Sequence, residues 1–526
     1  MIQIMLHNHT PRKSSSSKSP FAASQRFAME SLEERKLMAV GPWVPFAQII
    51  GQDQTFAAYP YLDGSNQTVA LVDRGVDYRH PQLGNGAAGP GQKVIGGYNF
   101  RDNTYNILDD YGHGTGVAGI IASDPYTYGG YNQGVAASTH LLMLKQESSA
   151  NIKAALDFVI QYHSHYNIQV INLTDFVSEV LPNSYNPDLY TSELKTLHDL
   201  GIFIVTPVGN GETFNNPAGN HVGIGLPASS PYVYGAGGIT LQDTMWPDSR
   251  RGAGLDILAP SSNVTMTYYL ANKVNGVGVN GYDQYDDNYT GTRVLANYAQ
   301  GTSWASAYVA GTATLIKQIN PAFTPDQIAQ IISSTGDPVA DNEDPSVSYP
   351  RLNIKRAVDL AFQMADDPYV GNTNFATATS LPYGGGVGSL GNLKFVIGHP
   401  DNFAFNVTKK QKVQIKVPYA GTGAYPFVLL FDQNQHIVAQ IGAGGLKTTL
   451  APGAYFIYVS ATQTLPGTYG VSIKGGSAFA RAVAAVVPAV VRSAFQSTAT
   501  FSSTPIASAT TAGNVLFTKK DTAVFA

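Results

Sequence analysis

The chain has 526 residues, of which 44% are hydrophobic and only 13% are charged, and it has a net charge of −4 at pH 7. This length predicts roughly two to four domains, and the small net charge argues against a protein that binds nucleic acid or an anionic membrane. Cysteine is absent and no run of about eighteen apolar residues occurs, which excludes disulfides and argues against a membrane span.

Residues 1–40 are a basic, serine-rich segment that ends in SLEERKLMAV. We interpret them as a disordered leader or export segment outside the fold, although they lack the apolar stretch of an ordinary signal peptide. SLEERKLMAV resembles a short N-terminal motif of exported bacterial proteins, and a charged, solvated helix is the alternative.

Residues 41–365 alternate short, continuously apolar runs such as TVALVD and IFIVTPV with segments of helical period. Apolar strands separated by helices predict an α/β fold, a doubly wound and mostly parallel sheet with helices on both faces. The helix in FTPDQIAQIISST is predicted to begin at Thr324, a capping residue, with Pro325 in its first turn.

The pattern changes near residue 366. Residues 366–475 lack a helical period and contain many short alternating strands separated by Gly, Pro and Asn, which predicts an antiparallel β-sandwich. Residues 476–526 are rich in Ala, Val, Ser and Thr and are interpreted as a low-complexity tail.

Four polar residues of the α/β region stand where chemistry is possible. Asp73 ends an apolar strand, His113 lies between glycines at a helix start, Asn210 lies in a Gly-Asn-Gly turn, and Ser303 precedes a helical run. Side chains at the carboxyl ends of parallel strands gather at one crevice. Taken singly, Asp73 and Ser303 can also be helix caps, and Asn210 an ordinary turn residue.

Together, these segments resemble the subtilisin family of serine peptidases over roughly residues 42–361. The resemblance lies in VALVDRGVDYRHPQL, YGHGTGVAGIIAS, PVGNGE and GTSWASAYVAG, in the family's order. It implies a secreted or cell-surface bacterial endopeptidase that acts on proteins or peptides. In it Ser303 is the nucleophile, His113 the general base, Asp73 its orienting partner and Asn210 the oxyanion donor.

The resemblance also implies which residues contact the substrate, namely Thr174, Asp175, Phe176, Gly209 and Thr302. NLTDFV replaces the family's usual N-L-S-x-G, so Phe176 stands where a glycine normally leaves room for the substrate. The alternative function is therefore a subtilisin-like pseudoenzyme or surface-binding protein with an obstructed cleft.

No cofactor is expected to be required and no metal ligand is assigned. Gln82 stands where the family often has a calcium-ligating aspartate, so the usual calcium site is not expected, although calcium binding elsewhere is possible. The acidic run at Asp283, Asp286 and Asp287 is interpreted as a solvated loop. Asp401 and Asp432 are interpreted as turn residues in preference to weak calcium ligands.

The strands of residues 366–475 resemble the pre-peptidase C-terminal domain of secreted bacterial peptidases, chiefly through LAPGAYFIYVS and GTYGVSI. This resemblance implies a role in secretion or in attachment to a cell surface. An attachment module with a vestigial peptidase is a third hypothesis.

Overall fold

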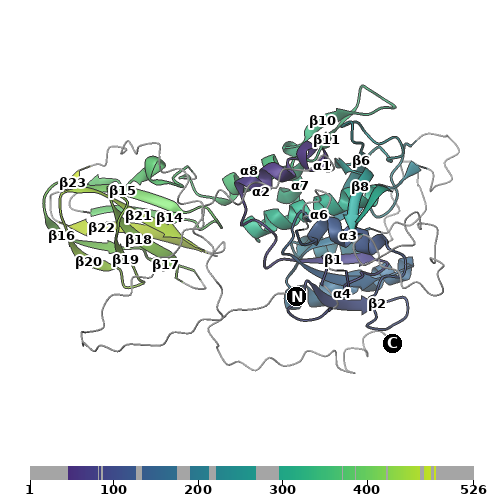
Figure 1. Cartoon of the computed structure of the whole chain (residues 1–526), viewed down its shortest axis with the longest axis horizontal. Coiled ribbons are helices and arrows are strands. Elements are labelled where there is room, and N and C mark those ends of the chain that lie inside the picture. The colour runs from purple at the N-terminus through teal and green to yellow at the C-terminus, as the bar shows by residue number, and fades with distance from the viewer. Residues whose placement is uncertain are drawn as a thin grey trace, which may run out of the picture. The chain divides into compact units, whose positions relative to one another are not determined.

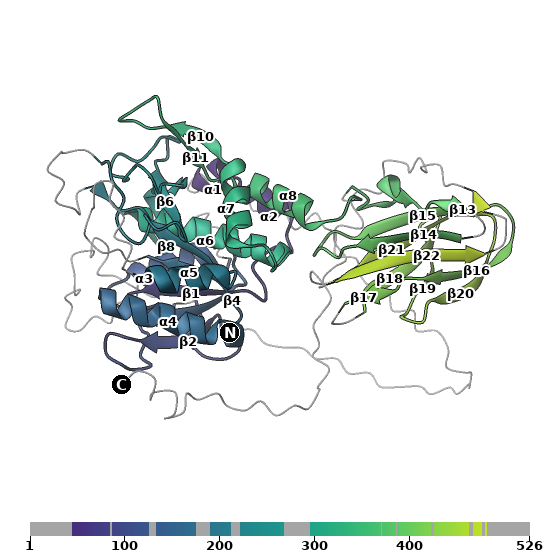
Figure 2. The same ribbon diagram turned by 180° about the vertical axis from the view of Figure 1, so that it is seen from behind.

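The structure is a computed structural model of the chain (Figures 1 and 2). It describes residues 45–480 except 81, 85–86, 126–132, 175–189, 212–220, 268–294, 370, 385–386, 422–424, 462–466 and 476–478. The expected leader and tail, and the acidic run at residues 283–287, therefore lie outside the described residues.

A nine-stranded sheet forms the centre of the α/β region, which here means the described part of residues 45–365. All neighbouring pairs in this sheet are parallel except the pair at one edge, β10 with β11, which is antiparallel. In spatial order the strands are β10 (Asp337–Ala340), β11 (Ser348–Arg351), β7 (Ile257–Pro260), β6 (Tyr234–Ile239), β5 (Phe203–Pro207), β4 (Ile168–Leu173), β1 (Thr68–Asp73), β3 (His140–Lys145) and β2 (Val94–Asn99).

Four of the inner strands are buried along their whole length. Every residue of β1, β5, β6 and β7 is buried, which explains why their sequences are apolar runs and not alternating patterns. The predicted mostly parallel α/β fold is confirmed.

The strand order reverses at β1. β3 pairs with one edge of β1 and β4 with the other, so the chain leaves β1 toward both sides of the sheet. A crevice forms at the carboxyl ends of the strands at such a reversal, and Asp73 is the last residue of β1.

Two pairs of helices pack on the inner strands. α3 packs against α6, and α4 packs against α5. The helices described are α1 (Pro45–Ile49), α2 (Gln52–Ala58), α3 (His113–Ala122), α4 (Ser149–Tyr166), α5 (Thr191–Asp199), α6 (Thr302–Ile319), α7 (Pro325–Ser334) and α8 (Ile354–Ala365).

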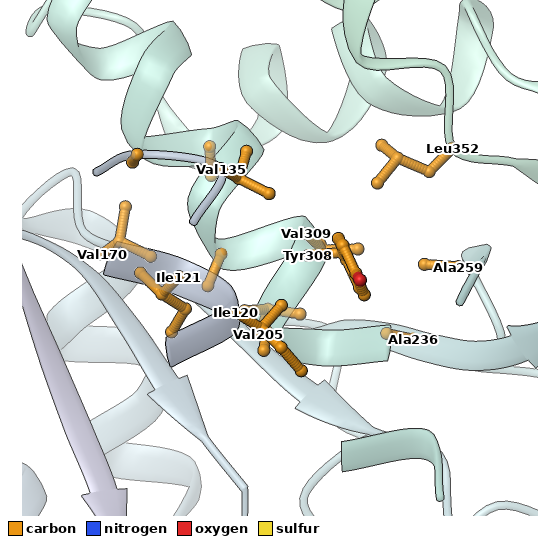
Figure 3. Packing of buried hydrophobic residues seen from close by; sticks show 14 of the residues in the cluster. Ile120, Ile121, Val135, Val170, Val205, Ala236, Ala259, Tyr308, Val309 and Leu352 are labelled. Carbon is orange, nitrogen blue, oxygen red and sulfur yellow. The ribbon is translucent and has the colours of Figure 1, made fainter. Parts of the chain in front are cut away.

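Helix α6 lies inside the hydrophobic core. All 18 of its residues are buried, and a helix without an exposed face must be surrounded by other elements. Figure 3 shows Tyr308 and Val309 of α6 among Ile120 and Ile121 of α3 and residues of several strands. Its small residues, Gly, Ala, Ser and Thr, let these elements approach closely.

Helix α7 confirms the predicted start. Thr324 is the N-cap and accepts a hydrogen bond from Gln327 N, while the Gln327 side chain accepts one from Thr324 N, and Pro325 is the first helical residue. In the described part of the chain, every helix is too short or too polar to cross a bilayer.

The C-terminal β region, residues 371–480, contains two further sheets, whose strand pairs are antiparallel apart from β12 with β15. One sheet has the order β12-β15-β21-β18-β19, with β23 also on β15, and the other has the order β13-β14-β22-β16-β20, with β17 also on β22. The strands are β12 (Thr379–Ser380), β13 (Tyr383–Gly384), β14 (Val387–Leu393), β15 (Asp401–Val407), β16 (Gln411–Lys416), β17 (Tyr419–Ala420), β18 (Phe427–Asp432), β19 (Ile437–Gln440), β20 (Leu446–Leu450), β21 (Gly453–Ser460), β22 (Thr468–Gly475) and β23 (Phe479–Ala480).

Both of these sheets contribute to one hydrophobic cluster. Phe403 and Ile457 come from one sheet and Ile415 and Val471 from the other. A short 3-10 helix, η4 (Phe375–Thr377), precedes β12. A fourth sheet, β8 (Ser262–Thr267) with β9 (Leu295–Gln300), belongs to the α/β region.

The structure corrects one of the two predicted turn aspartates. Asp432 ends β18 and accepts hydrogen bonds from Asn434 N and His436 N, as a turn residue does. Asp401, in contrast, begins β15 and is buried, with the Tyr469 hydroxyl donating to its carboxylate. The prediction of a turn at Asp401 was wrong because polarity alone does not distinguish a surface turn from a buried hydrogen-bonded pair.

Candidate active site

Asp73 and His113 form a hydrogen-bonded pair at the point where the strand order reverses. His113 is the first residue of α3, and its Nδ1 lies 2.9 Å from Asp73 Oδ2 and 3.0 Å from Oδ1. Asp73 is 1% exposed, so the carboxylate that faces the imidazole is almost fully removed from water.

Further donors hold the Asp73 carboxylate in its charged form. Arg74 N donates to Oδ1 at 2.6 Å, and the Thr174 hydroxyl donates to Oδ2. Burial by itself raises the pKa of Asp73, but the charge of His113 and these hydrogen bonds hold that pKa below its ordinary value. An ionised Asp73 can orient the imidazole by accepting from Nδ1–H.

The close approach of α3 to the end of β1 requires a glycine after His113. A Cβ atom at Gly114 would lie 2.0 Å from the Gly75 carbonyl oxygen and 3.0 Å from Asp73 Oδ1. Any side chain there would push the first turn of α3, and with it His113, away from Asp73.

A second buried carboxylate, that of Asp109, organises the chain just before His113. It accepts four hydrogen bonds, from Tyr111 N, Gly112 N, Thr115 N and the Thr115 hydroxyl. Burial raises the pKa of Asp109 despite these bonds. The sequence analysis did not single out Asp109, although its position four residues before His113 was visible in DDYGH.

Asn210 is fixed by the first residue of α6. Its Oδ1 accepts hydrogen bonds from Thr302 N and from the Thr302 hydroxyl, each at 2.9 Å. With Oδ1 thus engaged, the amide presents its Nδ2 donor, and a Cβ at Gly301 would lie 3.6 Å from this atom. Gly209 N also donates to the Thr302 hydroxyl, at 3.3 Å.

Ser303 is the second residue of α6 and is 5% exposed. The N-cap is Gly301, with φ 144°, and no side chain caps the helix. The alternative interpretation of Ser303 as a helix cap is therefore wrong. Trp304, the next residue, packs its ring 5.1 Å from the His113 ring, which places the start of α6 beside the start of α3.

The structure thus brings together the regions of all four residues that the sequence predicts to be catalytic. Thr302 joins the start of α6 to Asn210, Trp304 joins it to His113, and His113 joins Asp73.

The five residues predicted to contact the substrate are placed in part. Gly209 and Thr302 lie beside Asn210 and Ser303. Thr174 follows β4 and donates its hydroxyl to Asp73, a positioning contact that the sequence analysis missed. Asp175 and Phe176 lie outside the described residues.

Gln82 is buried and donates from Nε2 to the Asp124 carbonyl oxygen at 3.1 Å. The Lys93 ammonium lies 2.9 Å from the Asp124 carboxylate and donates to the Ala137 carbonyl oxygen. A lysine ammonium thus neutralises the acidic group in the neighbourhood of Gln82.

Comparison with known proteins places this site in a family. A sequence profile of the subtilase family matches residues 64–355, more than half of the chain. Thermophilic serine proteinase of Bacillus sp. (strain AK1) is 28% identical over 321 residues, which cover 59% of this chain and 66% of that protein. Subtilisin DY of Bacillus licheniformis is 26% identical over 53% of this chain and 86% of that protein.

The solved structure of MycP1 with its N-terminal propeptide removed is similar over 60% of this chain and 96% of that chain, with a TM-score of 0.46 and 24% identity. The profile match decides the classification: the chain belongs to the subtilase family of subtilisin-like serine peptidases. The match with thermophilic serine proteinase leaves about a third of that protein uncovered.

Proposed function

We propose that the protein is a serine endopeptidase in which Ser303 attacks the substrate carbonyl, His113 acts as general base and acid, and Asp73 orients the imidazole. The observation that carries this proposal is the pair of the buried Asp73 carboxylate and the His113 imidazole, 2.9 Å apart, next to the helix that begins with Thr302 and Ser303.

In this mechanism His113 Nδ1–H donates to Asp73, and Nε2 is the atom that accepts the Ser303 hydroxyl proton as Oγ forms a bond to the carbonyl carbon. The imidazolium that results is stabilised by the ionised carboxylate. It returns its proton to the leaving amine as the peptide C–N bond breaks, giving an acyl-enzyme. A water molecule, deprotonated by the same imidazole, then releases the acid product and Ser303.

The negative oxygen of each tetrahedral intermediate is stabilised by two donors, Asn210 Nδ2 and the Ser303 backbone N–H. Support comes from the two hydrogen bonds of Thr302 to Asn210 Oδ1, which fix the amide before the substrate arrives. The first turn of α6 adds the positive end of a helix dipole.

The substrates we propose are proteins or peptides, and the location is the cell exterior or surface. We propose further that no metal ion is required. The Lys93–Asp124 pair beside Gln82 supports this, since it supplies a fixed positive charge there.

The test is labelling with a fluorophosphonate, which phosphonylates an activated serine, together with hydrolysis of a casein substrate. Wild type should react and cleave, and Ser303→Ala should do neither. Asn210→Ala should lower kcat by about 10²–10³-fold. Equal absence of labelling in wild type and Ser303→Ala would overturn the proposal. Labelling without cleavage, restored by Phe176→Gly, would instead identify an obstructed cleft.

For the C-terminal β region we propose a β-sandwich that resembles the pre-peptidase C-terminal domain and serves surface attachment. The hydrophobic cluster shared by its two sheets supports the sandwich. A chain that lacks residues 367–526 should keep fluorophosphonate reactivity but lose retention on the surface of the producing cells. Unchanged retention would overturn the attachment role.

A further inference from the structure

A buried arginine lies behind the turn that carries Asn210. Arg251 is 2% exposed, and its guanidinium binds five acceptors. These are Asp341 Oδ1 at 2.8 Å, Asn342 Oδ1 at 3.0 Å, Glu343 Oε2 at 3.2 Å, and the carbonyl oxygens of Pro247 at 3.1 Å and Ser249 at 3.0 Å. The first three acceptors belong to the loop between β10 and β11, and the last two fix the path of residues 247–249.

The segment fixed in this way holds the Asn210 turn on both sides. Arg250 N donates to the Gly209 carbonyl oxygen at 3.1 Å, and Gly211 N donates to the Asp248 carbonyl oxygen at 2.6 Å. Asn210 lies outside the regular strands, and its backbone forms an isolated antiparallel bridge with Ser249. The backbone position of Asn210 therefore depends on residues 248–250.

The charged groups around Arg251 also contact the Asn210 turn through the side chain of His221. Glu343 accepts from His221 Nδ1. Arg251 N donates to the His221 carbonyl oxygen at 3.0 Å, and Gly223 N donates to the Arg251 carbonyl oxygen at 2.8 Å. The imidazole lies directly against Gly211, since a Cβ atom there would be 2.1 Å from His221 Cδ2. A glycine at this position lets the ring pack on the turn.

Burying a charged side chain such as that of Arg251 destabilises the fold unless groups of opposite charge and hydrogen-bond acceptors surround it. A buried guanidinium that loses its partners destabilises the fold strongly. Here Arg251 meets two carboxylates, the buried one of Asp341 and the more exposed one of Glu343, while its Nε has no hydrogen-bond partner among the described residues. Catalytic donors, for their part, must be placed within fractions of an ångström. The contacts of the two terminal guanidinium nitrogens give the Asn210 turn a rigidity that the turn's own few backbone bonds do not supply.

We infer that Arg251, together with Glu343 and His221, is a positioning residue for the oxyanion donor: the cluster fixes residues 247–251 and the His221 ring, and these hold Asn210 in place. The inference rests on the proposed function, because it assigns to the cluster a role in the step that Asn210 serves. We do not infer that Arg251, Glu343 or His221 contacts the substrate.

The decisive experiment is a double-mutant cycle between the cluster and Asn210. We expect Arg251→Lys, which keeps the charge but loses the forked geometry, to lower kcat by about 10–100-fold with KM changed less than about twofold. His221→Ala should lower kcat in the same way but less. In an Asn210→Ala background, each substitution should change kcat by less than about twofold, because the donor that it positions is gone.

Arg351→Lys is the matched control. Arg351 is also buried and also paired with aspartates, Asp337 and Asp243. Its guanidinium contacts these carboxylates and the Ile49 carbonyl oxygen, which are not part of the Asn210 turn. It should lower the melting temperature about as much as Arg251→Lys does and leave kcat unchanged.

Three results would count against the inference. Equal loss of kcat in both backgrounds, or loss of kcat in the Arg351 control, would show that Arg251 acts only through general stability. Unchanged kcat in His221→Ala and Arg251→Lys would overturn it directly. If Arg251→Lys does not fold, the cycle with His221→Ala decides. If the wild-type protein does not react with the fluorophosphonate, the proposed peptidase function itself is wrong. This outcome differs from the three above, in which the wild type is active.

Discussion

The α/β region and the C-terminal β region bury different kinds of groups. The α/β region buries Lys145, Arg251 and Lys317 almost completely, each with hydrogen-bond acceptors. Among the described residues of the C-terminal β region, no lysine or arginine is buried, and aromatic and aliphatic side chains fill the interior of that region.

This difference indicates which of the two regions fixes the positions of individual groups more exactly. Apolar packing stabilises a fold without specifying single directions, whereas a buried cation must meet its acceptors at set distances. Arg251 and Lys145 lie close to the candidate site. Arg251 is adjacent in sequence to a residue bonded to the Asn210 turn, and Lys145 donates to the Leu108 carbonyl oxygen beside Asp109.

The largest expected effect comes from removing the charge of the α/β region that faces His113. Asp73→Asn should lower kcat by about 10⁴-fold while the fold is kept, since an amide no longer holds the imidazole in the tautomer that accepts the serine proton. Hydrolysis of a peptide substrate measures this. Asp110→Asn, which alters an exposed carboxylate near the same helix, is the control, and a loss of activity of similar size there would contradict the role of Asp73.

A smaller effect is expected from Lys317, whose ammonium donates to the carbonyl oxygens of Gly201, Pro321 and Phe323. Lys317→Met should lower the free energy of unfolding by about 2–4 kcal/mol, because three carbonyl acceptors lose the buried ammonium that donates to them. Urea unfolding in a Ser303→Ala background, which prevents self-digestion, measures this. Lys355→Met, at a more exposed ion pair, should change it by less than about 0.5 kcal/mol; similar costs for the two would contradict the distinction.

The C-terminal β region has a buried carboxyl group of its own, that of Asp401, and the stability of this region should therefore depend on pH. The pKa of Asp401 is raised from 3.8 to about 8, chiefly by burial and also by the neighbouring charges of Asp367 and Asp366, against the hydrogen bond from Tyr469. The folded state therefore holds a proton that the unfolded chain releases above pH 4. The stability of this region should be greatest below pH 4 and should fall as pH rises from 4 to 8.

Hydrogen exchange of the β15 backbone amides at a series of pH values, corrected for the intrinsic rate, checks this. Asp401→Asn should flatten the dependence, and Asp432→Asn, at an exposed turn, should not. A dependence that survives Asp401→Asn would assign the effect to another group.

The smallest effect on stability is expected at the N-cap of α7, which the sequence predicted. Thr324→Ala removes the cap of α7 and should cost about 1 kcal/mol of stability, because the Gln327 N–H loses its acceptor. Ser334→Ala, near the other end of the same helix, is the control. If Thr324→Ala lowers the free energy of unfolding by less than the error of the urea measurement, water takes the place of the Thr324 hydroxyl as the acceptor.

The sequence predicted the elements that depend on local chemistry. The α7 start follows from Thr-Pro-Asp-Gln, a capping pattern, and the parallel sheet follows from apolar runs between helices. Asp73, His113, Asn210 and Ser303 could be grouped because their segments resemble one family. Their catalytic roles remain predictions that the experiments above test.

Features that depend on distant parts of the chain could not be predicted. Arg251 meets Asp341 across 90 residues and His221 meets Glu343 across 122, and no local pattern marks such pairs. Ser303 looked like a possible cap because serine is a common capping residue, but the backbone places Gly301 there. Asp401 looked like a turn residue for the same reason, that residue type alone does not reveal burial.

The complete burial of α6 has a consequence for the lifetime of the molecule. A peptidase shares its solution with copies of itself, and a segment is cut only when it opens far enough to enter another copy's cleft. Because no face of α6 is exposed, the helix opens only when the core around it comes apart. The serine that would perform self-digestion is therefore on one of the last segments that self-digestion can reach.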